Sequence, residues 1–280
     1  MNDGSIITIK GSRPGKTLTI IAGVHGQEIC GVLALREVLR AIADKELIIR
    51  AGEVNFIFAN LPALARGARQ IDMNLNRAFR PLEQLTEKEK NSYERGRAEQ
   101  LMPYLAESDA LLDIHSSTNK ESTPFIICEP HSYPIAKMLP FPIRSHGWDV
   151  IEAGGTDYYV NLNGGQGICI ECGSHDDPLA PQRALESIKI FLMLLGVIEI
   201  TKEIREIPNQ RVINANFIYK TVVNFDYRGS YPDFGSVKKN ELIGYDGGRE
   251  IRVPKDSLII FPQKREKSQQ EAFILAEEES

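Results

Sequence analysis

The chain has 280 residues, of which 42% are hydrophobic and 25% are charged. This length and composition allow a full hydrophobic core without disulfide bonds, which excludes a disordered chain and a disulfide-dense scaffold. The 33 basic and 38 acidic residues give a formal charge of −5 and form no basic stripe, so the charge pattern predicts no nucleic-acid partner.

The amino-terminal residues and the cysteines indicate the compartment. The opening stretch, MNDGSIITIKGSRPGKT, lacks the basic start and apolar core of a signal peptide. The longest apolar stretch, at 188–200, is interrupted by Lys189 and Glu199 and is too short to span a bilayer. Four cysteines are few for a secreted disulfide framework. We therefore expect a reduced, cytoplasmic protein with no membrane partner.

Short β-rich runs alternate with helical patterns over the first two thirds of the chain. The patterns predict strands at 17–22, 54–59, 110–114, 125–128 and 168–172. They predict helices at 28–43, at 86–102, where Pro103 is expected to end the helix, and at 181–195. Strands that are apolar on both faces and alternate with helices indicate an α/β fold. We expect a mixed, mainly parallel sheet with helices on both faces.

The pattern changes after residue 206, where no long helical pattern follows. Strands are predicted at 216–223, 241–245 and 257–261, separated by turn-rich stretches. Residues 263–280 carry mixed charge and are expected to fray. We therefore predict a catalytic domain at 1–205 and a small β-rich C-terminal domain at 206–280. The exposed turns of the second domain leave a homo-oligomer open.

The first strand-like run leads into His25 and Glu28, which lie three residues apart where the helical pattern begins. Ligands bind at the carboxyl ends of strands in an open α/β sheet. An imidazole and a carboxylate are two of the three protein ligands of a hydrolytic zinc site. Alone, this pair is better explained as a loop histidine and a helix-start glutamate that interacts with the helix dipole.

A second histidine completes the expected ligand set. His115 follows the predicted strand at 110–114 and therefore also lies at a carboxyl end. Asp113 lies two residues earlier on the same side of the strand, where its carboxylate can orient an imidazole. Three candidate ligands, two imidazoles and a carboxylate, at neighbouring strand ends predict a metal site.

A glutamate in an apolar strand is the candidate general base. Glu171 lies in the run GICIECG, where a buried carboxylate is costly unless it is paired or functional. Burial raises a carboxyl pKa, which suits a base near neutral pH. In a strand, Cys169 and Glu171 face one way and Cys172 the other, so the two cysteines are not expected to form a redox pair.

Four motifs, taken together, resemble those of the succinylglutamate desuccinylase/aspartoacylase family, part of the wider zinc carboxypeptidase superfamily. They are the GxHGxE of His25 and Glu28, the DxNLNRxF-like run at 72–79, the DxH that ends at His115, and Glu171. The resemblance covers about residues 17–173, and the β-rich tail resembles the family's small C-terminal domain. It implies a zinc-carboxypeptidase-like fold.

The resemblance also implies the metal chemistry. His25, Glu28 and His115 would bind one zinc ion per chain and leave a fourth position for water. Glu171 would take the proton from that water and pass it to the leaving amine. A non-catalytic metal-binding protein is a weaker alternative, because a closed structural site needs neither an open position nor a base.

The loop at 69–79 is implied to bind the substrate. Arg69 would polarise the scissile carbonyl and stabilise its oxyanion, and Asn76 and Arg77 would hold the carboxylate of the amino-acid portion. The family's further substrate-binding arginine would fall near residue 161, but no arginine or lysine lies between Arg144 and Arg183. Tyr158 is the candidate for that wall of the pocket.

These roles predict a zinc-dependent hydrolase that cleaves the amide bond of a small N-acyl amino acid. The missing arginine makes N-acetylaspartate doubtful as the substrate. A metallocarboxypeptidase acting on short peptides shares the mechanism and stays an open alternative. An elongated groove would favour peptides, and a closed funnel under the β domain would favour acyl amino acids.

Overall fold

The structure, a computed structural model, describes residues 4–201 and 203–279. The first two thirds of the chain alternate strands and helices, as the sequence predicts. Its strands are β1 (Ile6–Lys10), β2 (Arg13–Ala22), β3 (Ala51–Phe58), β4 (Ala110–Ser117), β5 (Phe125–Cys128), β6 (Ile143–His146) and β7 (Gln166–Ser174). Its α-helices are α1 (Ile29–Ala43), α2 (Leu61–Arg66), α3 (Glu87–Lys90), α4 (Tyr93–Ala106), α5 (Tyr133–Ala136), α6 (Trp148–Ile151), α7 (Thr156–Leu162) and α8 (Ala180–Leu194). Three short 3₁₀ turns, η1 (Leu75–Arg77), η2 (Leu82–Gln84) and η3 (Pro130–Ser132), lie in the connections.

One large sheet organises the molecule. Its strand order is β1-β3-β2-β4-β7-β5-β6, continued by β8 (Arg211–Lys220), β14 (Glu271–Glu278), β13 (Ser257–Ile260) and β10 (Gly235–Val237). The central strands β3, β2, β4 and β7 run parallel, so their carboxyl ends meet at one edge. The predicted mixed, mainly parallel sheet is therefore confirmed for the part that holds the candidate ligands.

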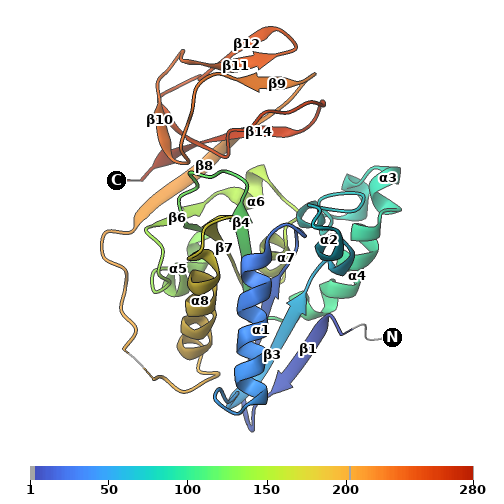
Figure 1. The fold of residues 1–280 in the computed structure, drawn as a ribbon, viewed down its shortest axis with the longest axis vertical. Helices are drawn as coiled ribbons and strands as arrows, with labels where there is room; N and C mark the ends of the chain where they lie inside the picture. Colours follow the sequence, from blue (N-terminus) through green and yellow to red (C-terminus); the bar gives the residue numbers. More distant parts are fainter. Residues whose placement is uncertain (1–3, 202, 280) are drawn as a thin grey trace.

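Helices cover both faces of this sheet. The helices α1 and α8 lie side by side on one face, while α4 and α7 lie on the other (Figure 1). Each face has its own buried apolar cluster: one includes Leu35 and Phe191, and the other includes Leu101 and Val160. Because both faces are buried, β4 is buried along its whole length, which matches its apolar sequence.

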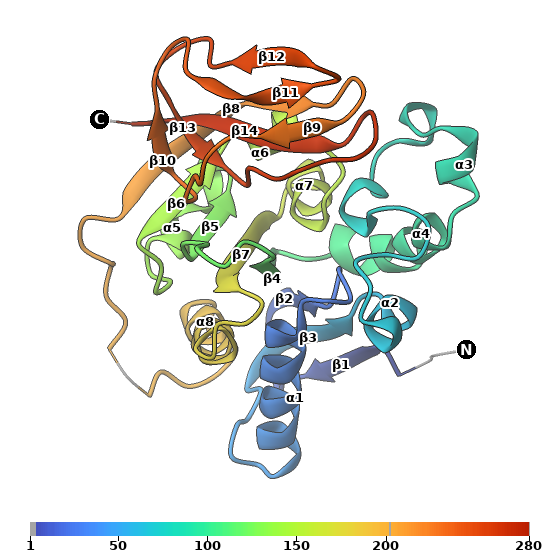
Figure 2. The same cartoon turned by 45° about the horizontal axis from the view of Figure 1, so that its top comes forward.

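The C-terminal β region lies over the carboxyl edge of the sheet (Figures 1 and 2). A separate three-stranded sheet joins β12 (Arg249–Arg252), β11 (Leu242–Asp246) and β9 (Phe225–Tyr227). The large sheet contains strands from both sides of the predicted boundary at residue 205, since β8 from the C-terminal part pairs in parallel with β6. The predicted domain boundary at 205 stays a prediction.

Two expectations about helix and strand ends are wrong. Pro103 does not end the helix but lies inside α4, which begins at Tyr93 after a break and continues to Ala106. The break before α4 is set by Ser92, whose side chain accepts a hydrogen bond from Arg95 N and caps the helix. The tail does not fray, because β14 pairs with both β8 and β13 and five of its residues are buried.

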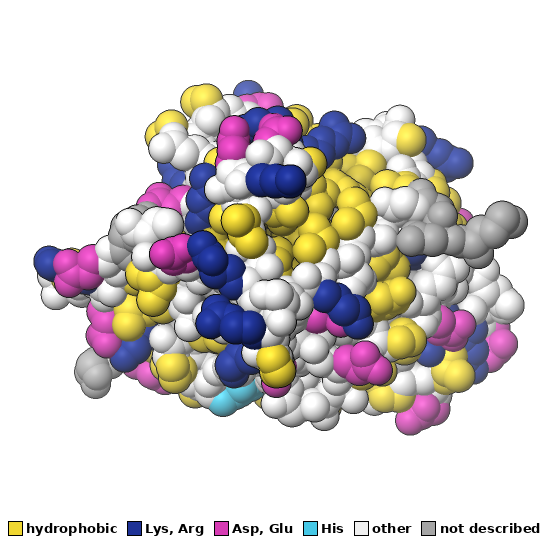
Figure 3. Space-filling view, turned by 90° about the horizontal axis from the view of Figure 1, so that it is seen from below, with side chains coloured by type: hydrophobic (Ala, Val, Ile, Leu, Met, Phe, Trp, Pro, Cys, Tyr) yellow, Lys and Arg dark blue, Asp and Glu magenta, His cyan; other side chains and the backbone are white. Residues whose placement is uncertain are grey.

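None of the helices within 4–201 and 203–279 has both the length and the apolar composition needed to cross a bilayer. Figure 3 shows the face opposite to the C-terminal region, where charged side chains surround a group of exposed hydrophobic side chains.

Candidate metal centre and active site

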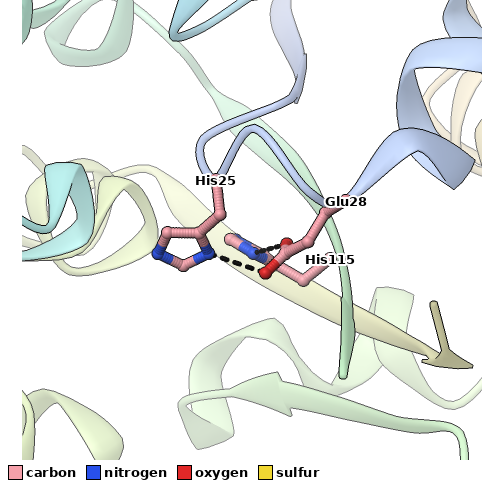
Figure 4. A group of neighbouring side chains, drawn as sticks. All are labelled: His25, Glu28 and His115. Atoms are coloured by element: carbon pink, nitrogen blue, oxygen red, sulfur yellow. Dashed lines mark hydrogen bonds and ion pairs between the residues drawn. The ribbon is translucent and has the colours of Figure 1, made fainter. Parts of the chain in front are cut away.

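Three predicted ligands meet at the carboxyl edge of the sheet. His25 and Glu28 come from the loop between β2 and α1, and His115 comes from the end of β4 (Figure 4). The Glu28 carboxylate lies between the two rings, with Oε1 2.8 Å from His25 Nδ1 and Oε2 2.7 Å from His115 Nδ1. One ligand atom from each residue lies within 4.8 Å of the other two, and all three residues are buried.

Close backbone packing brings this loop to the sheet. The strands β2 and β4 are adjacent and parallel, with Ala22 opposite Ile114, so the residues that follow each strand emerge side by side. Gly26 rests against α2, where a Cβ would lie 2.1 Å from the carbonyl carbon of Ala63. Only glycine therefore lets the loop between His25 and Glu28 approach so closely.

Hydrogen bonds to the outer ring nitrogens orient both histidines. His115 Nε2 lies 2.9 Å from Asp113 Oδ2, an arrangement that the spacing in the sequence predicts. Thr156 Oγ1 donates to the same carboxylate oxygen at 2.5 Å. His25 Nε2 lies 2.8 Å from Asn74 Oδ1, which also accepts from the backbone N–H of Asn76.

These bonds determine which partners the Nδ1 atoms of His25 and His115 can bind. Since each Nε2–H donates outward, each Nδ1 of a neutral ring presents a lone pair to the Glu28 carboxylate. Two lone pairs facing a carboxylate repel it unless a cation lies between them, either a ring proton or a metal ion. Two imidazole nitrogens and a carboxylate oxygen are the ligand types of a catalytic zinc site, so the residues fit zinc.

The charges of this cluster shift its pKa values in opposite directions. Burial raises the pKa of Glu28, but His25 and His115 together hold it well below its usual value. Burial lowers the pKa of His115, but Asp113, Cys169 and Glu28 raise it well above its usual value. The cluster therefore keeps Glu28 ionised, as a metal ligand must be.

Glu171 faces the same site from the next strand. It lies on β7 directly opposite His115 in the parallel register, and it lines the same pocket as His25 and His115. Its Oε2 has no hydrogen-bond partner among the described residues. Burial raises the pKa of Glu171 to about 8, although His115 opposes this shift. Such a carboxyl group can both take and return a proton near neutral pH.

The cysteines lie as the strand pattern predicts. Cys169 lines the pocket beside Glu171, whereas Cys172 packs into the cluster on the opposite face of the sheet. All four cysteines are free thiols.

The pocket is a cavity of about 120 Å³ between the sheet edge and the C-terminal β region. Its floor contains the two histidines and Glu171, and Asp149, Glu152 and Asp157 form an acidic wall. The C-terminal region closes the other side with Phe261, Gln263, Arg265, Glu271, Phe273 and Ile274. The sequence leaves open a closed funnel under the β domain, but no local pattern relates residues 261–274 to the histidines, so the individual residues are not predicted.

A buried glutamate positions the loop of Arg69 and Asn76. The fully buried Glu94 accepts the backbone N–H groups of Ile71, Asp72 and Met73 at 2.6–3.1 Å. The loop presents Arg69, whose Nη1 lies 3.7 Å from Glu28 Oε1 and whose side chain is half exposed. Asn76 lies against His115, with Nδ2 3.2 Å from Nε2. Both residues line the pocket.

Arg77 and Tyr158 are placed differently from Arg69 and Asn76. Arg77 lines the pocket, but its guanidinium is already bound by Glu152 at 2.7 Å and by both carboxylate oxygens of Glu271 at 3.0 and 3.2 Å. Tyr158 lies on α7 and is not among the residues that line the pocket, whereas the preceding Asp157 is. Neither Glu152 nor Glu271 was singled out from the sequence.

Replacing Arg77 with glutamine is expected to destabilise the fold by about 2–4 kcal/mol, because Glu152 and Glu271 lose their shared cation in a largely buried setting. Urea denaturation measures this loss. Arg211→Gln is the matched control, since its pair with Glu278 is exposed and is worth at most about 1 kcal/mol. Equal losses in the two variants would contradict a structural role for Arg77.

Comparisons with known proteins agree with the geometry. The profile of the succinylglutamate desuccinylase/aspartoacylase catalytic domain matches residues 14–197. A succinylglutamate desuccinylase from Pseudoalteromonas atlantica is 23% identical over 88% of this chain and 77% of that protein. An N-acyl-aromatic-L-amino acid amidohydrolase from Xenopus laevis is 28% identical over 41% of this chain and 39% of that protein. The solved succinylglutamate desuccinylase from Vibrio parahaemolyticus superposes with a TM-score of 0.81 at 17% identity, covering 99% of this chain and 86% of that one, and so supports the fold.

Proposed function

Since the chain belongs to the succinylglutamate desuccinylase/aspartoacylase family, we propose that it is a zinc-dependent hydrolase of N-acyl amino acids. It would cleave the amide bond and release a carboxylate and an amino acid. The observation that carries the proposal is the buried His25–Glu28–His115 cluster facing the unpaired carboxyl group of Glu171. A site that binds metal only for structure has no use for such a group.

The residues of the pocket divide the chemistry between them. His25, Glu28 and His115 would hold zinc, which lowers the pKa of a bound water to about 7 and polarises the scissile carbonyl. Glu171 would take a proton from the attacking water and return it to the leaving nitrogen. Arg69 would donate hydrogen bonds to the carbonyl oxygen as it gains negative charge.

Asn76, Arg77 and Tyr158 are the remaining residues that the sequence predicts to contact the substrate. Asn76, next to His115, would donate to the substrate beside the scissile bond. Arg77 could reach a substrate carboxylate only by exchanging Glu152 or Glu271 for it. Tyr158 could contribute only after a rearrangement of α7, because it lies outside the pocket lining.

The closed shape favours an acyl amino acid over a peptide. The C-terminal region covers one side of the pocket, and the preformed space of about 120 Å³ suits a small ligand better than an extended peptide. The test is a panel of N-formyl, N-acetyl and N-succinyl amino acids, with dipeptides and tripeptides as competitors, assayed by amino acid release. We expect the N-acyl amino acids to be the better substrates. Faster hydrolysis of tripeptides would instead support a metallocarboxypeptidase, and bound zinc without hydrolysis would support a non-catalytic protein.

A further inference from the structure

Three arginines line the pocket: Arg69, Arg77 and Arg265. They differ in how much of their charge is available to a ligand. Arg69 lies beside Glu28, with Nη1 3.7 Å from Oε1, and its proposed role at the scissile carbonyl already uses its charge. Arg77 is enclosed by Glu152 and Glu271, so its charge is already compensated within the protein.

Arg265 has a different environment. Its Nε donates to the backbone carbonyl of Glu271 at 2.6 Å, which fixes the plane of the guanidinium. Within residues 4–201 and 203–279, no carboxylate forms an ion pair with it, and its terminal nitrogens have no hydrogen-bond acceptor. Arg265 is therefore a fixed cation whose two outer nitrogens are available to a ligand.

The backbone of Arg265 is also held in place. Its N–H donates to Phe225 O at 2.8 Å and its carbonyl accepts from Phe225 N at 2.7 Å, which links it to the fully buried Phe225. Arg265 therefore loses little conformational entropy when a ligand binds.

The other charged groups of the pocket direct a carboxylate to the same place. Asp149, Glu152 and Asp157 form an acidic wall from α6, α7 and the loop between them. Glu152 is paired with Arg77, and burial raises the pKa of Asp149 to about 7 and that of Asp157 to about 6. The wall therefore offers a substrate carboxylate no free cation, and it repels the carboxylate once these acids ionise. Arg265 lies on the opposite side, where the neighbouring Glu271 carboxylate is already paired with Arg77.

We propose that Arg265, contributed by the C-terminal β region, binds the carboxylate of the amino-acid portion of the substrate. This inference rests on the proposed function and deepens it by naming a specificity residue. The family's catalytic-domain profile ends at residue 197 and does not include Arg265.

The test separates binding from turnover. In a Glu171→Gln background, which prevents hydrolysis, calorimetry measures the binding of N-acetyl-L-phenylalanine and of its carboxamide, N-acetyl-L-phenylalaninamide. Adding Arg265→Gln is expected to weaken binding of the carboxylate by about 10- to 100-fold, because a charged hydrogen-bonded pair is lost. Binding of the carboxamide is expected to change by less than about twofold, since it carries no charge for Arg265 to pair with.

Lys264→Gln is the matched control, because it removes the same charge one residue away on a side chain that is 63% exposed. It should leave both affinities unchanged. If Arg265→Gln does not fold, Arg265→Lys is measured in its place. It is expected to weaken binding of the carboxylate, and not of the carboxamide, by about threefold or more, because an ammonium group lacks the planar fork of a guanidinium. The proposal is overturned if Arg265→Gln weakens binding of the carboxylate and the carboxamide equally, or if Lys264→Gln weakens binding of the carboxylate as much as Arg265→Gln does.

The results separate a wrong role for Arg265 from a wrong proposed function. If the wild-type protein hydrolyses N-acyl amino acids and the Arg265 variants keep the wild-type preference for the carboxylate over the carboxamide, only the role of Arg265 is wrong. If the wild-type protein hydrolyses none and the Glu171→Gln variant binds neither probe, both fail.

Discussion

Replacing Glu171 with glutamine is expected to lower kcat by about 10²–10⁴ while the metal stays bound. Glutamine has nearly the same shape but cannot take the proton from the attacking water. Glu171 faces the metal ligands without being one of them, and its Oε2 has no partner among the described residues. The measurement is the rate of amino acid release, with elemental analysis of the same sample.

The control applies the same chemical change where no proton transfer is expected. Glu199 is exposed and pairs with Arg50 on a different part of the molecule, so Glu199→Gln should keep full activity. Full activity in Glu171→Gln would refute the assignment of the general base. Loss of metal from Glu171→Gln would instead make Glu171 a ligand.

Removing His115 is expected to abolish metal binding and, with it, activity. The variant His115→Ala keeps only two of three protein ligands and leaves Glu28 facing a single histidine. Asp113→Asn keeps all three ligands but weakens the bond that orients the His115 ring, so metal affinity should fall by about 10- to 100-fold. Metal content after dialysis, and zinc titration with a competing chelator, measure the two effects.

His131 is the matched control for these variants. It lies outside the pocket lining and pairs through Nε2 with Asn161, so His131→Ala should keep its metal. A full equivalent of tightly bound zinc in His115→Ala would rule out the proposed ligand set.

The sequence predicted the parts of the fold that are set by local patterns. Runs such as 17–22 and 110–114 are apolar on both faces because they lie at the centre of a sheet covered by helices, and they became β2 and β4. The first strand, β1, was missed because it is short and at the edge, with only partial burial. The last strand was missed because its charged ends obscured an apolar centre that pairs with strands from other parts of the chain.

The cluster of candidate metal ligands was predictable for the same reason. His25 and Glu28 follow β2, and His115 lies at the end of the adjacent parallel strand β4, so their positions in the sequence place them together. The supporting residues were not predictable in this way. Glu94 lies on α4, 21–23 residues along the chain from the loop that it positions. Arg265 and Glu271 reach the pocket only because the C-terminal region folds over the sheet. Such contacts depend on tertiary packing, which no local spacing encodes.

The most direct test of the account is activity before and after metal removal. The purified protein is analysed for metal, treated with a chelator, dialysed, and assayed with the best N-acyl amino acid of the panel as zinc is added back. The account predicts that hydrolysis is lost with the metal and returns in full at about one zinc per chain. Hydrolysis that persists without metal, or a protein that takes up no zinc, would contradict it.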